Sequence, residues 1–272
     1  MDDRRIEGTL GFLGFGNMGR AIASGLVQTG VIAPESVLAC DVDPERLRDA
    51  EQIGMTPVAS VAELAARADT LVLAVKPQTM DEALAGLRAH IRPETLVISI
   101  AAGISIDRVR DRLGSAIRIA RAMPNTPALV GAGAAGVAMG PGCTDADRAV
   151  VRAVFEAVGI CVFVEETQID AVTAVSGSGP AYFFLMVESL TAAGVASGLP
   201  EDAAARLAAQ TLYGAGKLLA DSADGPGTLR ARVTSKGGTT EAALKQLQND
   251  GFERVIHQGV AAAAARSREL GR

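Results

Sequence analysis

Short apolar runs alternate with helical patterns through the first half of the chain. Several of these runs contain almost no polar residue, which is typical of strands in a parallel sheet covered by helices on both faces. The pattern predicts strands at residues 9–13, 37–40, 70–75, 95–100 and 117–119, a glycine-rich strand ending at Met139 and a last strand at 161–164, with helices at 18–28, 44–53 and 145–158. This alternation predicts an open α/β sheet.

The pattern changes after Thr167, where the strand signal disappears. From there on, apolar residues recur at helical spacing, Pro200 opens one helix, and another is expected over residues 241–249. We therefore predict two domains. Residues 1–166 form a Rossmann-like, open and mostly parallel sheet that binds a dinucleotide, and residues 167–272 form an all-helical domain for substrate binding and dimerisation.

The composition fits two folded domains and excludes several kinds of site. The chain has 272 residues, of which 49% are hydrophobic and 21% charged, as in folded globular proteins. A net charge of −5 and an aromatic content of 3% give no basic field for nucleic acid or anionic lipid and no platform for stacked bases. Three dispersed cysteines and two histidines predict no metal site and a reducing compartment.

One stretch, from Ala171 to Gly198, is nearly free of charge, with Glu188 as its single ionisable carboxylate. Its serines, glycines and proline argue against a membrane-spanning helix, whereas burial in a subunit interface explains the missing charges. The chain begins with a charged, acidic segment rather than the basic start of a secretory signal. We predict a cytoplasmic homodimer or higher homo-oligomer with no membrane and no nucleic-acid partner.

A glycine-rich segment, Leu13-Gly14-Phe15-Gly16-Asn17-Met18-Gly19, joins the first predicted strand to the first predicted helix. In such a segment the first glycine permits a tight turn, the second lets the backbone approach a pyrophosphate, and the third allows close helix packing. The phosphates would rest on the helix N-terminus. We assign residues 13–19 to cofactor binding.

An acidic residue, Asp41, follows the second strand at the distance expected in a dinucleotide-binding fold. Its carboxylate would bond the adenosine ribose and repel a 2′-phosphate, which favours NADH. In the alternative geometry, Asp41 caps the helix that begins at Pro44, and Arg46 or Arg48 meets the phosphate of NADPH. Asp43 is the better cap because it directly precedes Pro44.

Two small-residue motifs interrupt the helical half, Val175-Ser176-Gly177-Ser178-Gly179-Pro180-Ala181-Tyr182 and Val233-Thr234-Ser235-Lys236-Gly237-Gly238-Thr239-Thr240-Glu241. Glycine and proline cost helix stability, and hydroxyl side chains prefer caps and turns. Both motifs should therefore leave N–H groups and hydroxyls pointing into a shared space, where they could bind a small anion. We expect Thr239 or Thr240 to cap the helix that runs from Glu241.

Together with the glycine-rich segment, these motifs resemble those of the pyrroline-5-carboxylate reductase family, and the resemblance covers nearly the whole chain. It implies catalytic roles for Ser235, Thr239 and Thr240, with Thr240 as the proton donor, and substrate binding by Ser176, Ser178, Gly179, Gly237 and Gly238. It also implies cofactor contacts from Ala74, Val75, Lys76 and Pro77, from Ile100, Ala101 and Ala102, and from Asn125. By its own turn chemistry, Asn125 would instead stabilise its loop.

The function that the resemblance implies is reduction of L-1-pyrroline-5-carboxylate to L-proline by hydride transfer from a nicotinamide. Because many such reductases use NADPH, the choice between NADH and NADPH stays open. Two alternatives remain. A β-hydroxyacid dehydrogenase would need a lysine base with an asparagine four residues on, a pair that we expect at neither Lys217 nor Lys245. A non-catalytic NAD(P)-binding protein would need no binding site for a carboxylate.

Overall fold

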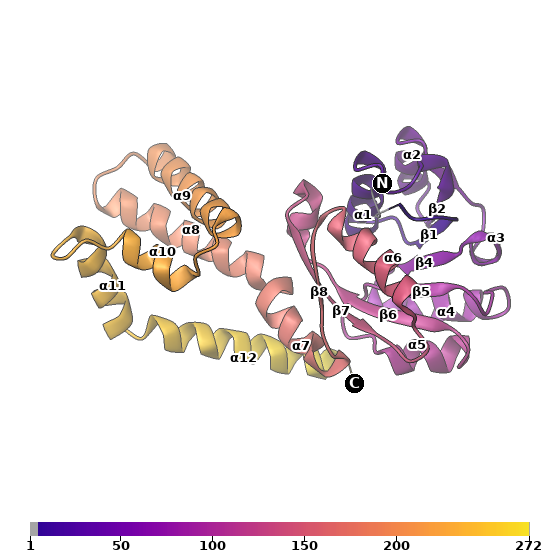
Figure 1. Ribbon diagram of the computed structural model, residues 1–272. Coiled ribbons are helices and arrows are strands. Elements are labelled where there is room, and N and C mark those ends of the chain that lie inside the picture. The colour runs from indigo at the N-terminus through magenta and orange to yellow at the C-terminus, as the bar shows by residue number, and fades with distance from the viewer. Residues whose placement is uncertain (1–4, 272) are drawn as a thin grey trace. The chain divides into compact units, whose positions relative to one another are not determined.

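The computed structural model describes residues 5–271 of the chain, and its centre is an eight-stranded sheet (Figure 1). The strands lie in the order β3-β2-β1-β4-β5-β6-β7-β8. All neighbours are parallel except β6 and β7. The predicted open, mostly parallel sheet is confirmed. Its strands are β1 (Leu10–Leu13), β2 (Val37–Cys40), β3 (Thr56–Pro57), β4 (Thr70–Leu73), β5 (Leu96–Ser99), β6 (Arg118–Met123), β7 (Gly133–Met139) and β8 (Gly159–Phe163).

Helices cover both faces of the sheet, as strands this apolar require. Ile22 and Val154 belong to the apolar core on one face, and Leu64, Leu84 and Val109 belong to the core on the other. The first face carries α1 (Asn17–Gln28), α2 (Pro44–Gln52) and α6 (Asp145–Glu156), and the second carries α3 (Val61–Arg67), α4 (Met80–Arg88) and α5 (Ile106–Leu113). Three short 3-10 turns, η1 (Pro34–Ser36), η2 (Pro77–Thr79) and η3 (Thr126–Val130), complete this part.

The strand β6 is longer than its apolar pattern predicts. The pattern ends at Ile119, yet the strand continues to Met123 because Ala120 to Met123 pair with β7. Arg121 breaks the apolar run but is only 9% exposed, since it forms an ion pair with Glu166. A charge that is paired in this way is tolerated inside a strand.

Within the described residues, everything after β8 is helical, as the sequence predicts. The elements are η4 (Glu166–Gln168), α7 (Ile169–Val172), the π-helical turn η5 (Thr173–Gly177), α8 (Gly179–Ala196), α9 (Glu201–Asp221), α10 (Pro226–Arg232), α11 (Thr239–Asn249) and α12 (Phe252–Leu270).

The chain divides into two compact units. The sheet unit contains the described residues up to Ser178 and those from Ala263 onward, and the helical unit contains Gly179–Ala262. Contacts explain why α7 and the end of α12 belong to the sheet unit. A Cβ atom added to Gly136 in β7 would lie 2.5 Å from the Val172 side chain, and the Ser267 hydroxyl donates a hydrogen bond to Asp170 at 2.6 Å.

Candidate active site

The carboxyl ends of four strands meet at one edge of the sheet unit. β2, β1, β4 and β5 are adjacent, parallel and in register. The Ala74 N–H donates to the Leu13 carbonyl at 2.8 Å, and the Ile100 N–H donates to the Leu73 carbonyl at 3.1 Å. The residues that directly follow the four strands, Asp41, Gly14, Ala74 and Ile100, therefore lie along one edge. Ligands of open α/β sheets bind at this edge.

The glycine-rich segment forms a turn that only glycine allows at two positions. Gly14 has φ +92°, and a Cβ atom on it would lie 2.8 Å from the carbonyl carbon of Ala74. A Cβ atom on Gly19 would lie 2.7 Å from the Gly14 carbonyl oxygen, so this glycine lets α1 approach the turn. A Cβ atom on Gly16 would meet open space. Gly14 and Gly19 thus have the turn and packing roles expected of them, and the approach of Gly16 to a pyrophosphate stays a prediction.

This turn fits the pyrophosphate of a dinucleotide. Gly16 is the N-cap of α1, and no side chain caps that helix, so the first backbone N–H groups and the positive end of the helix dipole face the open side of Gly16. Leu13 and Phe15 bury their side chains in the core, so neither side chain is open to a ligand. Asn17 is exposed and Met18 half-buried.

The Asp41 carboxylate ties the glycine turn to the end of β2. Its Oδ2 accepts the Phe15 N–H at 2.6 Å, and its Oδ1 accepts the Asp43 N–H at 2.9 Å. Asp43 is the N-cap of α2 and accepts the Glu45 N–H at 2.9 Å. The alternative in which Asp41 caps α2 is therefore wrong, because Asp43 takes that role. Arg46 lies 3.9 Å from the carboxylate of Asp43.

The other predicted cofactor residues follow β4 and β5. Lys76 is exposed, and its carbonyl accepts the N–H and the hydroxyl of Thr79, both at 3.0 Å. Val75, Pro77 and Ala102 are half-buried, whereas Ala101 is buried. The strand ends thus bring the predicted residues of three sequence motifs together at one edge, and their contacts with a cofactor stay predictions.

The side chain of Asn125 is used within the protein. It is 8% exposed; its Oδ1 accepts the Ala134 N–H at 2.8 Å, and its Nδ2 donates to the Ser176 carbonyl at 3.0 Å. The turn-stabilising role that the sequence left open is thus present. It also extends to the first small-residue motif, whose residues 175–178 lie in the same compact unit.

That first motif interrupts the helix, as predicted, and does so as a π-helical turn. The Ser178 N–H donates to the Thr173 carbonyl, five residues back, at 2.8 Å. The Ser176 hydroxyl donates to the Val172 carbonyl at 3.0 Å, which leaves its oxygen lone pairs available. Such π-turns occur frequently at functional sites. Gly179, which follows, is buried and begins α8.

The second motif forms a compact turn at the start of α11 in the helical unit. The N-cap is Gly238, and no side chain caps the helix. The expected cap by Thr239 or Thr240 is therefore wrong, because the helix begins at Thr239 and both threonines lie in its first turn. Thr240 is half-buried, whereas Thr239 and Ser235 are exposed.

Two hydrogen bonds close this turn. The Gly238 N–H donates to the Ser235 carbonyl at 3.0 Å, and the Gly237 N–H donates to the Glu241 carboxylate at 2.6 Å. Glu241 therefore occupies a backbone donor that was predicted to bind the substrate carboxylate. An incoming anion would have to displace this side chain to reach the Gly237 N–H.

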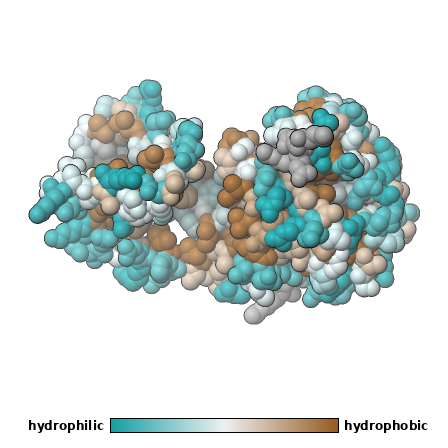
Figure 2. All heavy atoms as spheres, viewed as in Figure 1, coloured by the Kyte–Doolittle hydropathy of each residue, from teal (hydrophilic) through white to brown (hydrophobic). Residues whose placement is uncertain are grey.

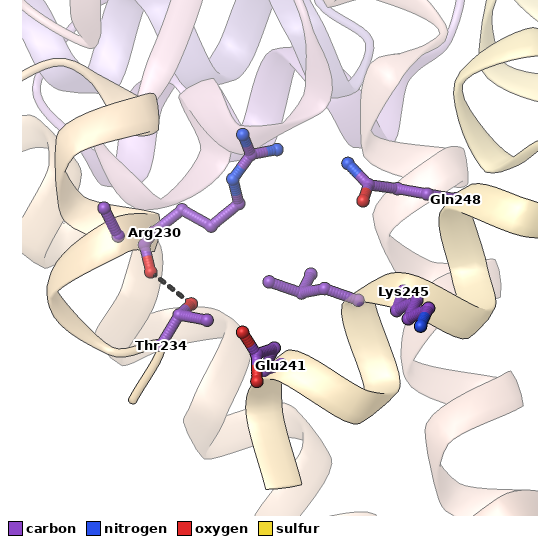
Figure 3. A pocket seen from close by; sticks show the side chains of 7 residues that line it. Arg230, Thr234, Glu241, Lys245 and Gln248 are labelled. Carbon is purple, nitrogen blue, oxygen red and sulfur yellow. Dashed lines mark hydrogen bonds between the residues drawn. The ribbon is translucent and has the colours of Figure 1, made fainter. Parts of the chain in front are cut away.

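A cavity of about 330 Å³ lies beside this turn, between α10 and α11 (Figure 3). In Figure 3 the polar ends of Arg230 and Gln248 extend into the open space from the two helices, and the Thr234 hydroxyl donates to the Arg230 carbonyl at 2.7 Å. The lining residues are Arg230, Ala231, Thr234, Glu241, Leu244, Lys245 and Gln248. None of the predicted catalytic residues lines it, although Thr234 and Glu241 flank them in sequence.

An ion pair in the sheet unit was not predicted from the sequence. The Glu166 carboxylate accepts a hydrogen bond from the Arg121 guanidinium at 3.2 Å and another from the Ile106 N–H, at the start of α5, at 2.8 Å. The signal that could have found it is a single arginine inside an apolar strand. A charge there requires a partner from another element.

The cysteines are poor candidates for chemistry. All three are free thiols, and burial is the main cause that raises each pKa, for Cys161 to about 11. Over residues 5–271, no three His, Cys, Asp or Glu side chains are grouped so that they could hold a metal ion.

Comparisons with known proteins agree with this geometry. Residues 166–270 match the family described as pyrroline-5-carboxylate reductase dimerisation, and residues 9–103 match that described as NADP oxidoreductase, coenzyme F420-dependent. The chain is 43% identical to the pyrroline-5-carboxylate reductase of Pseudomonas aeruginosa over 96% of both chains.

Two solved structures share the complete fold. A pyrroline-5-carboxylate reductase from Coxiella burnetii superposes with a TM-score of 0.94 at 34% identity, covering 98% of this chain and 100% of that one. The Plasmodium falciparum pyrroline carboxylate reductase with NADP bound gives a TM-score of 0.85 at 31% identity, with the same coverage. The family expected from the motifs is confirmed, and the chain belongs to the pyrroline-5-carboxylate reductase family.

Proposed function

We propose that this chain reduces L-1-pyrroline-5-carboxylate to L-proline with NADH or NADPH. The observation that carries the proposal is a full-length match to reductases of this substrate on a chain whose strand ends form a dinucleotide site. The reaction adds a hydride to the imine carbon and a proton to the ring nitrogen, so that the C=N bond becomes a single bond. The bound nicotinamide supplies the hydride and is oxidised.

The sheet unit would hold the cofactor. The N–H groups at the start of α1 bind the pyrophosphate above Gly16, and Asp41 orients the glycine turn through its bond to the Phe15 N–H. Residues 74–77 and 100–102 then line the nicotinamide half, because they follow the neighbouring strands. The Asp41 charge disfavours a 2′-phosphate, so we propose a preference for NADH.

Substrate binding would fall to the two small-residue motifs. The Ser178 hydroxyl and the turn from Ser235 to Thr240 would offer uncharged donors to the substrate carboxylate, and Thr240 would donate the proton to the ring nitrogen. The Ser176 hydroxyl donates to the Val172 carbonyl, so it would have to leave that bond to donate to the substrate. A cyclic imine is basic enough to take a proton from a positioned hydroxyl or to arrive protonated. This explains how a site with no histidine serves the reaction.

The β-hydroxyacid dehydrogenase alternative has one feature in its favour. The expectation that Lys245 lacks such an asparagine is wrong, because Asn249 follows it by four residues in α11, and Lys245 lines the cavity. This lysine–asparagine spacing is the one that such a dehydrogenase needs for its base. The reductase activity remains the better proposal because the full-length relatives carry that name.

Domain division and assembly extend the proposal. We keep the division at residue 166 as a prediction, with residues 1–166 binding the cofactor and 167–272 binding substrate and a second copy. The match to a dimerisation family supports a homo-oligomer, and we propose a homodimer or a larger assembly in the cytoplasm. The segment Glu166–Ala196 passes a length and hydropathy test for a membrane span, but it falls within the dimerisation match.

An assay of the purified protein tests this function. NADH or NADPH oxidation should follow addition of pyrroline-5-carboxylate, with proline as the product. The matched control is oxidation of small β-hydroxyacids with NAD⁺ or NADP⁺. Turnover of hydroxyacids alone would support the dehydrogenase, and cofactor binding without any turnover would support a non-catalytic protein.

A further inference from the structure

Pro180 removes one backbone donor shortly after the π-helical turn η5. In an α-helix the Ser176 carbonyl would accept the N–H of residue 180. Residue 180 is proline, which has no N–H. The Asn125 side chain donates to this carbonyl instead, with Nδ2 at 3.0 Å from the oxygen. A loop residue thus supplies the hydrogen bond that Pro180 removes.

The orientation of the Asn125 amide is fixed by its second bond. Its Oδ1 accepts the Ala134 N–H of β7 at 2.8 Å. An amide has one acceptor oxygen and one donor nitrogen, so the bond to β7 forces the NH₂ group toward Ser176. At 8% exposure, the side chain has little water to compete for either bond. Asn125 therefore links the π-turn to the sheet by these two hydrogen bonds, which we call the Asn125 clip.

The strand β6 and the loop after it also hold the beginning of the segment 166–178. Arg121 in β6 pairs with Glu166, the first residue of η4, which leads directly into α7. A Cβ atom on Gly177 would lie 2.8 Å from the terminal methyl carbon of Met123, so the turn packs closely on the end of β6. Residues 166–178 are thus attached at both ends to residues 121–125.

β6 is parallel to β5 and adjacent to it, so the loop after β6 lies at the edge of the sheet that carries the cofactor residues. We propose that Asn125 is a positioning residue, which holds the π-turn and with it Ser176 and Ser178 at this edge. The proposal rests on the proposed function, because it gives these serines their substrate. It predicts that breaking the clip weakens substrate binding and leaves cofactor binding intact.

The test uses the full chain with Asn125→Asp and Asn125→Ala. Asn125→Asp keeps an acceptor for the Ala134 N–H but places an oxygen against the Ser176 carbonyl. We expect the KM for pyrroline-5-carboxylate to rise by roughly tenfold, as for loss of one buried hydrogen bond, while the Kd of NADH and of NADPH, measured by fluorescence without substrate, stays within about twofold. Thr173→Val is the matched control, because it removes a hydroxyl bond to Ile169 in the same segment without touching the clip.

A rescue separates positioning from a general loss of structure. Pro180→Ala supplies a backbone N–H for the Ser176 carbonyl. Asn125→Ala alone should raise the KM, and adding Pro180→Ala to it should reverse part of that rise. Faster hydrogen exchange at residues 173–178 in Asn125→Ala should accompany the loss and be reversed by the same rescue.

Three results would overturn the proposal. The first is a weaker cofactor Kd with an unchanged substrate KM, which would make Asn125 a direct cofactor ligand. The second is no change in KM or exchange, and the third is no rescue by Pro180→Ala. If the wild type fails to turn over pyrroline-5-carboxylate, the proposed function fails, but the exchange and cofactor measurements still decide whether the clip exists.

Discussion

Asp41 has two separable effects on the cofactor site. Its carboxylate accepts the N–H groups of Phe15 and Asp43, at 2.6 and 2.9 Å, and so holds the glycine turn against β2. It also places a negative charge beside the turn, where the 2′-phosphate of NADPH would be repelled. The first effect supports both cofactors, whereas the second discriminates between them.

We expect Asp41→Ser to shift the ratio of kcat/KM toward NADPH by about tenfold or more, since it removes the repulsion between the carboxylate and the phosphate. It should also weaken both cofactors, because the shorter side chain loses the bond to Phe15. Asp41→Asn is the matched control: it removes the charge but keeps an oxygen for one N–H. Steady-state kinetics with both cofactors measure the shift, and an equal ratio in wild type and both variants would rule out a ribose contact.

Replacing Thr240 tests the proposed proton donor without a change in the stability of the protein. Because the helix is capped at Gly238 without a side chain, Thr240→Ala should leave the melting temperature nearly unchanged. Its kcat should fall by about a hundredfold, as for loss of a general acid, with little change in cofactor Kd.

The matched control is Thr228→Ala, which removes an exposed threonine from the first turn of α10, where Gly225 is likewise an N-cap without a side-chain bond. This variant should keep its kcat. A Thr240→Ala enzyme with normal kinetics would take Thr240 out of the site.

At the scale of elements, the glycine turn predicts opposite effects for two glycines. Gly14→Ala should destabilise the protein by about 1–3 kcal/mol, because φ is +92° and the Cβ would meet the Ala74 backbone. Gly16→Ala should leave stability nearly unchanged, since its Cβ meets open space, but it should weaken cofactor binding by crowding the pyrophosphate.

Thermal melts and cofactor titrations measure the two effects. Gly30→Ala controls for positive φ alone, because Gly30 has φ +71° and open space around it. If Gly16→Ala binds both cofactors as tightly as the wild type, the pyrophosphate does not lie over this turn.

The strands were predictable because their burial is uniform. β1, β2, β4 and β5 are each four residues long and buried throughout, so their apolar runs stand out from the sequence. The helices α3, α4 and α5 were not predicted. They have seven, nine and eight residues, which give few turns of an apolar period. The helix α2 also has nine residues, but Asp43 and Pro44 mark its start in the sequence.

The site was predictable where one local segment determines the geometry. Gly14 and Gly16 act within a single strand–turn–helix unit, and their arrangement follows from spacing alone. The Asn125 clip joins residues 51 positions apart, and Arg121 finds its partner 45 positions away. Only the packed structure brings such pairs together. The cap of α11 was placed wrongly because glycine and threonine compete for the same position.

At the scale of the whole molecule, the helix α8 explains the near absence of charge after residue 170. Phe183, Phe184 and Leu185 are 57%, 61% and 62% exposed in the single chain. Figure 2 shows hydrophobic side chains at the surface of both units. Apolar area of this kind is typical of a surface that another protein covers, and the dimerisation match over residues 166–270 supports a second copy as that protein.

We therefore expect sedimentation to show a homodimer or a larger assembly, and Phe184→Glu to weaken it. Burying a new carboxylate in place of a phenyl ring should cost at least about 2 kcal/mol of association, or roughly thirtyfold in Kd. Ala85→Glu is the matched control, since it adds the same charge at an exposed position of α4. If substrate binding needs the assembly, the specific activity of Phe184→Glu should fall as the protein is diluted. An active wild-type monomer would contradict this, because α8 would then expose its apolar side chains to water with no partner to cover them.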